Sequence, residues 1–251
     1  MITLLGLGFD NLDVSQAASC IASRPREAPF GYVVTPNADH LVRISRDNAL
    51  RTIYRGSALC LLDSRVVAGL ARLLRLAVPR VVPGSDLTEY VLLHHIAPAE
   101  RITIVGLSPD WLPALVARCG LAPPAHYNPP MGFDRDPAAL ADTLAFVRAN
   151  PARLVFLAVG SPRQEYLAAA LATAGDITGT GLCVGASLEY LAGACRRAPR
   201  FMRRAGLEWL FRFASEPRRL FRRYMIDSPV VIALLLKQRW SGRQVGSLPR
   251  A

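Results

Sequence analysis

Polar side chains stand where apolar stretches of the chain end, and their types suit acid–base chemistry and the binding of hydroxyl groups. The run "YVVT" ends in Thr35 and continues as "PNADHL", which adds the amide of Asn37. The run "ALCLLD" ends in Asp63, and "RLVFLAV" is followed by "GSPRQE", which contains Gln164. Hydroxyl, amide and carboxylate groups can bind the hydroxyl of a substrate, and a carboxylate can also take its proton.

Asp63 has the features of a general base. A carboxylate at the end of an apolar strand is partly desolvated, and partial burial raises its affinity for a proton. Capping of a helix that begins near Ser64 explains the same residue equally well. Capping is also the favoured interpretation of Asn37 or Asp39, because a helical pattern starts directly after them.

The turn "GSPRQE" leads into a helix whose free amides, with Gln164, suit a sugar or phosphate oxygen. Proline is also common near the start of helices in general, so this turn alone is only moderately specific as a sign of a binding site.

The elements that position these residues follow from apolar periodicity. Strands are predicted at 2–7, 32–35, 58–63, 101–106, 153–159 and 176–185, and helices near 13–23, 38–54, 64–75, 86–96, 109–119, 136–149 and 163–174. This alternation predicts an α/β fold with a Rossmann-like, mostly parallel sheet flanked by helices on both faces. Ligands of such sheets bind at the carboxyl ends of the strands, which is where the polar residues are expected.

The charge of the chain is concentrated at its C-terminal end. Residues 1–195 contain 16 arginines and 16 acidic residues, whereas residues 196–251 contain 14 basic and 3 acidic residues, which accounts for the whole net charge of +11. From Pro217 to Met225, a helical wheel places the arginines on one arc and the apolar residues on the opposite arc. Basic faces with aromatic anchors suit an anionic membrane surface.

Two other interpretations of this tail stay open. One is nucleic-acid binding, which lacks support from any helix-turn-helix, RNA-binding aromatic motif or zinc knuckle. The other is a helix docked on its own core with solvated arginines. The apolar run at 229–236 is too short to span a bilayer, which needs about 20 residues.

Several site classes are disfavoured by spacing. The histidines and the five cysteines form no zinc pattern, and the odd cysteine number indicates reduced thiols in a cytosolic protein. "GLGFDN" lacks the third glycine of a dinucleotide fingerprint. Asp134 and Asp136 form an Asp-x-Asp pattern, which can bind a metal, but capping of the following helix explains Asp136 more simply.

The motifs "TPNADHLV", "LLD", "PRVVPGSDL" and "GSPRQE", and the arginine-rich stretch from "VGASLEYLAG" to "EPRRLFRRY", together resemble the WecG/TagA/CpsF glycosyltransferases, family 26, over nearly the full chain. The resemblance implies a bacterial, inverting enzyme that uses no metal and no cofactor. Such an enzyme moves a sugar from a UDP donor to a polyprenyl-diphosphate-linked saccharide at the inner face of the plasma membrane. It serves exopolysaccharide, capsule, teichoic acid or common antigen synthesis.

The resemblance also implies roles for residues. Asp63 matches the catalytic base, and Arg80 matches a residue that steadies the diphosphate leaving group. Thr35 and Asn37 match contacts to acceptor or donor, and Gln164 matches a donor-sugar contact. In the tail, Arg218, Arg222 and Arg223 are the arginines expected to contact the diphosphate.

The implied organisation is an α/β core (1–195) and a basic helical appendage (196–251) that docks on the membrane and completes the site. Ser64 and Glu189 stand where many members have glycine and aspartate. Relatives' cores self-associate, which suggests a homo-oligomer. The alternative is an inactive, membrane-associated scaffold of a polysaccharide assembly complex. The sequence does not decide whether the donor carries N-acetylmannosamine, its uronic acid or glucose.

Overall fold

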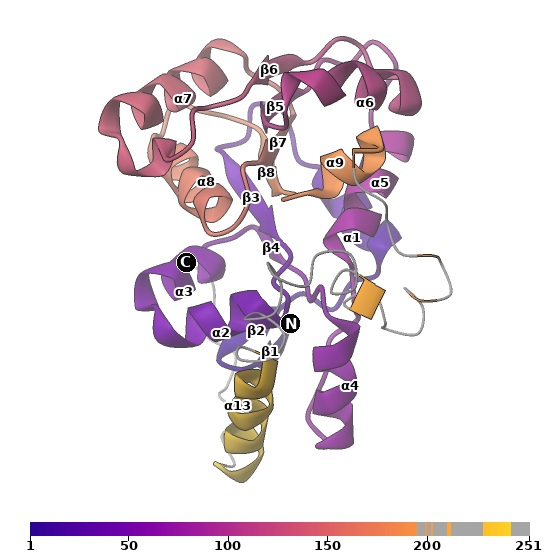
Figure 1. Ribbon diagram of the computed structural model, residues 1–251, viewed down its shortest axis with the longest axis vertical. Helices are drawn as coiled ribbons and strands as arrows, with labels where there is room; N and C mark the ends of the chain where they lie inside the picture. The colour runs from indigo at the N-terminus through magenta and orange to yellow at the C-terminus, as the bar shows by residue number, and fades with distance from the viewer. Residues whose placement is uncertain (195–198, 200–201, 203–209, 212–227, 242–251) are drawn as a thin grey trace.

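A six-stranded parallel sheet forms the centre of the protein, as the computed structural model shows (Figure 1). The structure describes residues 1–194, 199, 202, 210–211 and 228–241. The strands are β3 (Gly31–Val34), β4 (Leu59–Cys60), β5 (Thr103–Gly106), β6 (Ala125–Tyr127), β7 (Leu154–Ala158) and β8 (Thr180–Cys183), in the order β4-β3-β8-β7-β5-β6. Every neighbouring pair is parallel, so the predicted α/β fold is confirmed.

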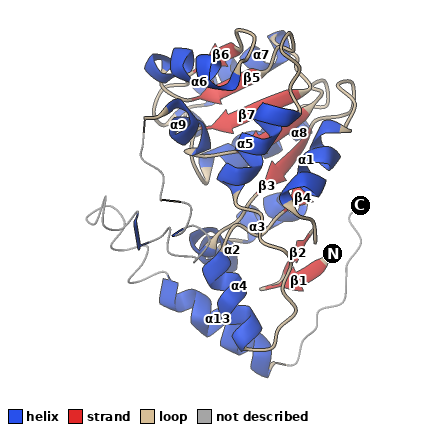
Figure 2. Ribbon diagram, turned by 90° about the vertical axis from the view of Figure 1, so that its right-hand side faces the viewer, coloured by secondary structure: helices blue, strands red, loops and turns tan. Residues whose placement is uncertain are grey.

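Helices cover both faces of the sheet (Figure 2). They are α1 (Val14–Ala22), α2 (Ala38–Arg46), α3 (Asn48–Arg55), α4 (Arg65–Leu73), α5 (Gly84–His94), α6 (Leu112–Cys119), α7 (Pro137–Ala149), α8 (Arg163–Thr173), α9 (Ser187–Ala192) and α13 (Ser228–Trp240), with short 3₁₀ turns at Pro109–Trp111 and Phe133–Arg135. Each stretch predicted to be helical is therefore helical, with bounds shifted by a few residues, although the stretch at 38–54 is divided into two helices.

Alternation along the strands divides the core into two layers. Val34 and Leu157 face the layer packed under α2, α3 and α8, whereas Val33 and Phe156 face the layer under α1, α5, α6 and α9. Successive side chains of a strand point to opposite faces, so each strand contributes to both layers. Such a sheet, buried on both faces, explains why its strands read as continuous apolar runs.

The strand predicted at 2–7 is wrong in extent and in partner. The segment instead forms an antiparallel hairpin of β1 (Ile2–Leu4) and β2 (Leu7–Phe9), separate from the central sheet. Leu5 and Gly6 make the turn, with φ values of 52° and 74°. Two consecutive residues with positive φ form the tight turn whose twist matches a hairpin.

The helix predicted at 38–54 is two helices. Asp47 adopts an extended conformation (φ −127°, ψ 110°), ends α2 and caps α3, since its carboxylate accepts a hydrogen bond from Leu50 N at 3.0 Å. Asp competes for backbone donors in this way, which favours a cap over a helix interior.

Most of the predicted appendage, including Arg218, Arg222 and Arg223, lies outside the described residues. Its described helix, α13, packs against α2 and α4 and buries Val231 and Leu235 in the core. Gln238 Oε1 also accepts a hydrogen bond from Leu5 N at 2.8 Å. The apolar run at 229–236 is therefore in part a core-packing face. None of the described helices combines the length and apolarity that crossing a bilayer requires.

Candidate active site

The predicted polar residues of the core gather at the carboxyl edge of four adjacent strands. Thr35 follows β3, Asp63 follows β4, and the turns after β7 and β8 carry Gln164 and Gly185. Because β4, β3, β8 and β7 are consecutive in the sheet, these loops open on one side of it. This edge is where ligands bind in open parallel sheets.

Thr35 lies against the first residue of α5. A Cβ atom added at Gly84 would come within 2.5 Å of Thr35 Oγ1, so only glycine fits there without moving the hydroxyl. The N-cap of α5, Pro83, makes no side-chain capping bond. The half-buried Thr35 hydroxyl therefore stands beside the amide end of α5.

Asn37 caps α2, as the favoured interpretation of the sequence predicted. Its Oδ1 accepts hydrogen bonds from Asp39 N at 3.1 Å and from His40 N at 3.4 Å. The His40 ring closes the capping box through Nδ1, 3.4 Å from Asn37 N. The carbonyl oxygen of the side chain is thus committed to the helix.

Asp63 is not the cap of the helix that follows it. Ser64 takes that role, since its hydroxyl accepts a hydrogen bond from Val67 N at 3.2 Å. Asp63 N donates to Pro36 O at 3.1 Å, which ties the residue to the loop between Thr35 and Asn37. Asp63 is half-buried at the carboxyl edge of the sheet.

Arg80 is held beside the start of α1. Its Nη1 donates to Asp13 Oδ2 at 2.8 Å and to Gln16 Oε1 at 3.3 Å, and its backbone N donates to Asn11 Oδ1 at 3.0 Å. The segment that follows Arg80 pairs with the chain between β4 and Asp63, since Val82 N donates to Leu62 O. Arg80 therefore borders the site, and 56% of its side chain is exposed.

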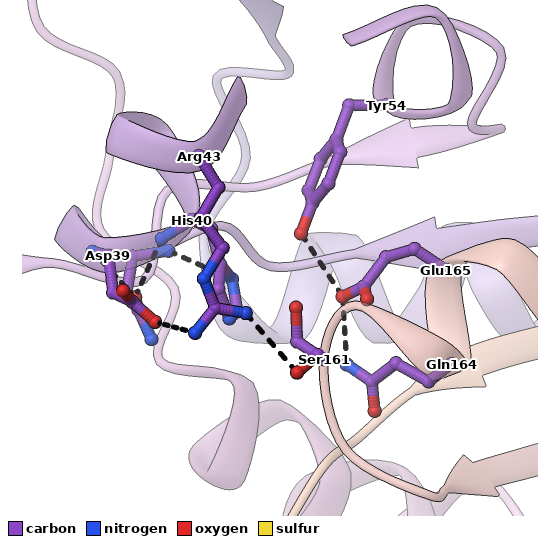
Figure 3. Close-up of polar contacts among 8 residues, drawn as sticks. Asp39, His40, Arg43, Tyr54, Ser161, Gln164 and Glu165 are labelled. Carbon is purple, nitrogen blue, oxygen red and sulfur yellow. Dashed lines mark hydrogen bonds and ion pairs between the residues drawn. The ribbon is translucent and has the colours of Figure 1, made fainter. Parts of the chain in front are cut away.

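Gln164 belongs to a buried polar chain that joins α3, α8 and the end of β8 (Figure 3). Gly185 N donates to Gln164 Oε1 at 2.8 Å, and Gln164 Nε2 donates to Glu165 Oε1 at 2.9 Å. Tyr54 Oη donates to the same oxygen at 3.1 Å. Burial raises the pKa of Glu165 and raises the pKa of Tyr54 well above its usual value, so burial favours the protonated, neutral form of both groups.

Arg43 links the β3 side of the site to the β7 side, and it was not among the residues predicted for the site. Its Nη2 forms an ion pair with Asp39 at 2.5 Å, and its Nη1 donates to Ser161 O at 3.2 Å. Figure 3 shows the guanidinium between Asp39 and the turn at Ser161. Only the spacing of Asp39 and Arg43, four residues apart on a helix, could have indicated the pair.

Asp136 caps α7, as the sequence predicted. Its Oδ1 accepts from Ala138 N at 3.0 Å and from Ala139 N at 3.5 Å. Within the described ranges, no three histidine, cysteine, aspartate or glutamate side chains gather as metal ligands would.

Comparison with protein families identifies one that spans the fold. The model described as "Glycosyl transferase WecG/TagA/CpsF family" matches residues 2–245, which is nearly the whole chain and includes every site residue discussed above.

Proposed function

Because the chain belongs to the WecG/TagA/CpsF family of glycosyltransferases, which act in the synthesis of cell-surface polysaccharides, we propose that it is an inverting transferase with Asp63 as its base. The donor is a UDP-sugar and the acceptor is a saccharide linked to polyprenyl diphosphate. We further propose that no metal takes part and that the protein works at the inner face of the plasma membrane.

The proposed reaction is one in-line displacement. The Asp63 carboxylate takes the proton of the acceptor hydroxyl as its oxygen attacks the anomeric carbon. The bond from that carbon to the UDP oxygen breaks on the opposite face, and UDP leaves with its electron pair. A single displacement inverts the anomeric centre.

The observation that supports this proposal most is the placement of Asp63. Asp63 N donates a hydrogen bond to Pro36 O, which lies between Thr35 and Asn37. The N-cap of α4 is the next residue, Ser64. A half-buried carboxylate at the ligand-binding edge of the sheet has the position that a general base requires.

The leaving diphosphate needs cationic groups, and Arg80 is the proposed one in the core. Its ion pair with Asp13 is exposed, and exposed ion pairs are weak, so the guanidinium can exchange partners at small cost. The tail residues Arg218, Arg222 and Arg223 are proposed to supply the remaining charge. Removal of one preorganised donor of this kind typically lowers the rate about 10²–10³-fold.

The test is Asp63→Asn with a panel of UDP-glucose, UDP-N-acetylmannosamine and the corresponding uronic acid, on a polyprenyl-diphosphate-linked acceptor. We expect turnover by the wild type with one of these donors and a loss of at least about 10²-fold in kcat for the variant. Turnover of the variant near the wild-type level would show that Asp63 is not the base. If the wild type turns over no donor, the scaffold alternative is favoured instead.

The membrane part of the proposal is supported by the end of the molecule formed by α4 and α13, which project side by side (Figure 1). Leu73 on α4 is 79% exposed and Trp240 on α13 is 80% exposed. Both helices also carry exposed cations, namely Arg65, Arg72, Lys237 and Arg239. Residues 64–85 and 228–251 contain no acidic residue. Apolar side chains among cations suit an anionic bilayer surface.

Since α4 begins two residues after Asp63 and rises about 1.5 Å per residue, its exposed end is roughly 15 Å from the proposed base. A lipid-linked acceptor could therefore reach the site from this surface. The double variant Leu73→Ser/Trp240→Ser should lose sedimentation with phosphatidylglycerol vesicles. Met131→Ser is the matched control, because Met131 is 88% exposed but lies outside α4 and α13, where its sulfur contacts Arg163 at the start of α8. Equal sedimentation of both variants would place the membrane contact elsewhere.

A further inference from the structure

The buried side chains around Gln164 form a support that the proposed mechanism does not use. Glu165 is 1% exposed and Tyr54 is 0% exposed, although each carries a polar group. Burying a polar group is unfavourable unless its hydrogen bonds are made. A cluster of this kind beside a binding edge therefore needs either a structural or a functional reason.

The hydrogen bonds of this cluster fix the orientation of one amide. Gln164 Oε1 accepts from Gly185 N, and Gln164 Nε2 donates to Glu165 Oε1. In the opposite orientation of the amide, the donor Nε2 would face another donor, the Gly185 N–H. The acceptor Oε1 would face another acceptor, the Glu165 oxygen to which Nε2 now donates. Glu165, on α8, thus holds the nitrogen of the amide, and Gly185, after β8, holds its oxygen.

We propose that Glu165 is a positioning residue for the donor sugar: its carboxyl group, anchored by Tyr54, holds the Gln164 amide so that the second Nε2 hydrogen is presented to the sugar. This inference rests on the proposed function, because it needs a donor sugar beside Gln164. An amide nitrogen has two hydrogens, and Glu165 accepts one of them.

The surroundings of Glu165 fit this role. Glu165 Oε2 and Ser161 Oγ are buried and lack a hydrogen-bond partner of good geometry in the described part of the chain. Both belong to the turn into α8, which the Arg43 guanidinium binds through Ser161 O. Burial also raises the pKa of Glu165, which favours the neutral form of this hydrogen-bonding group.

A double-mutant cycle on Gln164 and Glu165 tests the inference. Gln164→Met and Glu165→Met are each expected to raise KM for the UDP-sugar that the wild type uses by roughly three- to tenfold, the size of one neutral hydrogen bond. KM for the acceptor should stay unchanged. If Glu165 acts through Gln164, the double variant has the donor KM of Gln164→Met alone, because the two changes remove one interaction.

Conservative variants separate positioning from stability. Glu165→Gln keeps an oxygen that can accept from both Tyr54 and Gln164, so its donor KM should return to the wild-type value. Tyr54→Phe removes only the anchoring hydroxyl and should give an intermediate donor KM. If Glu165→Met does not fold, Tyr54→Phe takes its place in the cycle.

The outcomes distinguish this inference from the proposed function. Equal rises in KM for donor and acceptor, or additive effects in the cycle, would show that Glu165 supports only the fold. A rise in donor KM for Gln164→Met but not for Glu165→Met would overturn the inference and leave the proposed function intact. A wild type that turns over none of the UDP-sugars would overturn the proposed function itself.

Discussion

The contact between Gly84 and Thr35 can be tested with a single methyl group. In Gly84→Ala, the new Cβ would lie 2.5 Å from Thr35 Oγ1 and 3.3 Å from Thr35 Cβ. The first distance is far shorter than a van der Waals contact, so the hydroxyl must shift or rotate away from its position. The variant therefore perturbs the site without removing any of its functional groups.

The expected change in stability is a balance of two effects. Alanine is favoured over glycine in a helix by about 1 kcal/mol, whereas over-packing costs about 1–3 kcal/mol. Gly84→Ala should therefore lower the free energy of unfolding by about 0–2 kcal/mol. Gly69→Ala is the matched control, because Gly69 is exposed within α4 and nothing lies within 4 Å of its added Cβ. This control should gain up to about 1 kcal/mol.

Thermal unfolding and turnover of the UDP-sugar together give the readout. The two variants should differ by about 1–3 kcal/mol, which is roughly 2–12 °C in Tm for a chain of this size. Only Gly84→Ala should lose turnover, and adding Thr35→Ala to it should restore stability but not activity. The reasoning is refuted if Gly84→Ala is as stable as Gly69→Ala and keeps full turnover.

Three further predictions concern other parts of the molecule. Leu235→Ala should lower the free energy of unfolding in urea by about 2–5 kcal/mol, because the side chain of Leu235 is fully buried. Ile232→Ala, on the exposed side of α13, should change this free energy by less than about 1 kcal/mol. Equal effects of the two variants would mean that α13 does not pack on the core. The raised pKa of Glu165 makes the folded state bind its proton more tightly than the unfolded state, so wild-type stability should fall as the pH rises above the usual value of 4.5. Glu165→Gln cannot titrate, and its stability relative to the wild type should rise over that range; a pH-independent difference would contradict a buried neutral carboxyl. EDTA should leave turnover unchanged, and turnover that EDTA abolishes and Mn²⁺ restores would make Asp134 and Asp136 metal ligands instead.

The sequence predicted the central sheet and its helices well, because strands buried on both faces read as apolar runs and several helices, such as α2, α4 and α7, begin at a capping side chain. The hairpin at residues 2–9 escaped prediction for a specific reason. Its turn places Leu5 at φ 52°, where asparagine or aspartate is the usual signal, so "ITLLGL" reads as one strand. β6 was missed because its three residues are all half-buried and give no apolar run.

The placement of the candidate residues in the fold was predicted in part. The positions of Thr35, Asn37 and Asp63 at strand ends indicated a shared edge, and the structure has them there. The contacts of Glu165 could not be predicted, since its partners Tyr54 and Gly185 are distant in the chain and meet only after the sheet has formed. The partner of Arg80, Asp13, is 67 residues away and gives no local signal either.

The hydrogen bond from Leu5 to Gln238 has a consequence for folding of the protein during its synthesis. The two residues are 233 positions apart, and ribosomes add about 5–20 residues per second. The β1–β2 turn and the α2 surface are therefore made roughly 10–50 s before the helix that covers them. During synthesis, an unfinished chain presents this surface to chaperones or to other copies of itself, and completion of α13 marks the end of that interval.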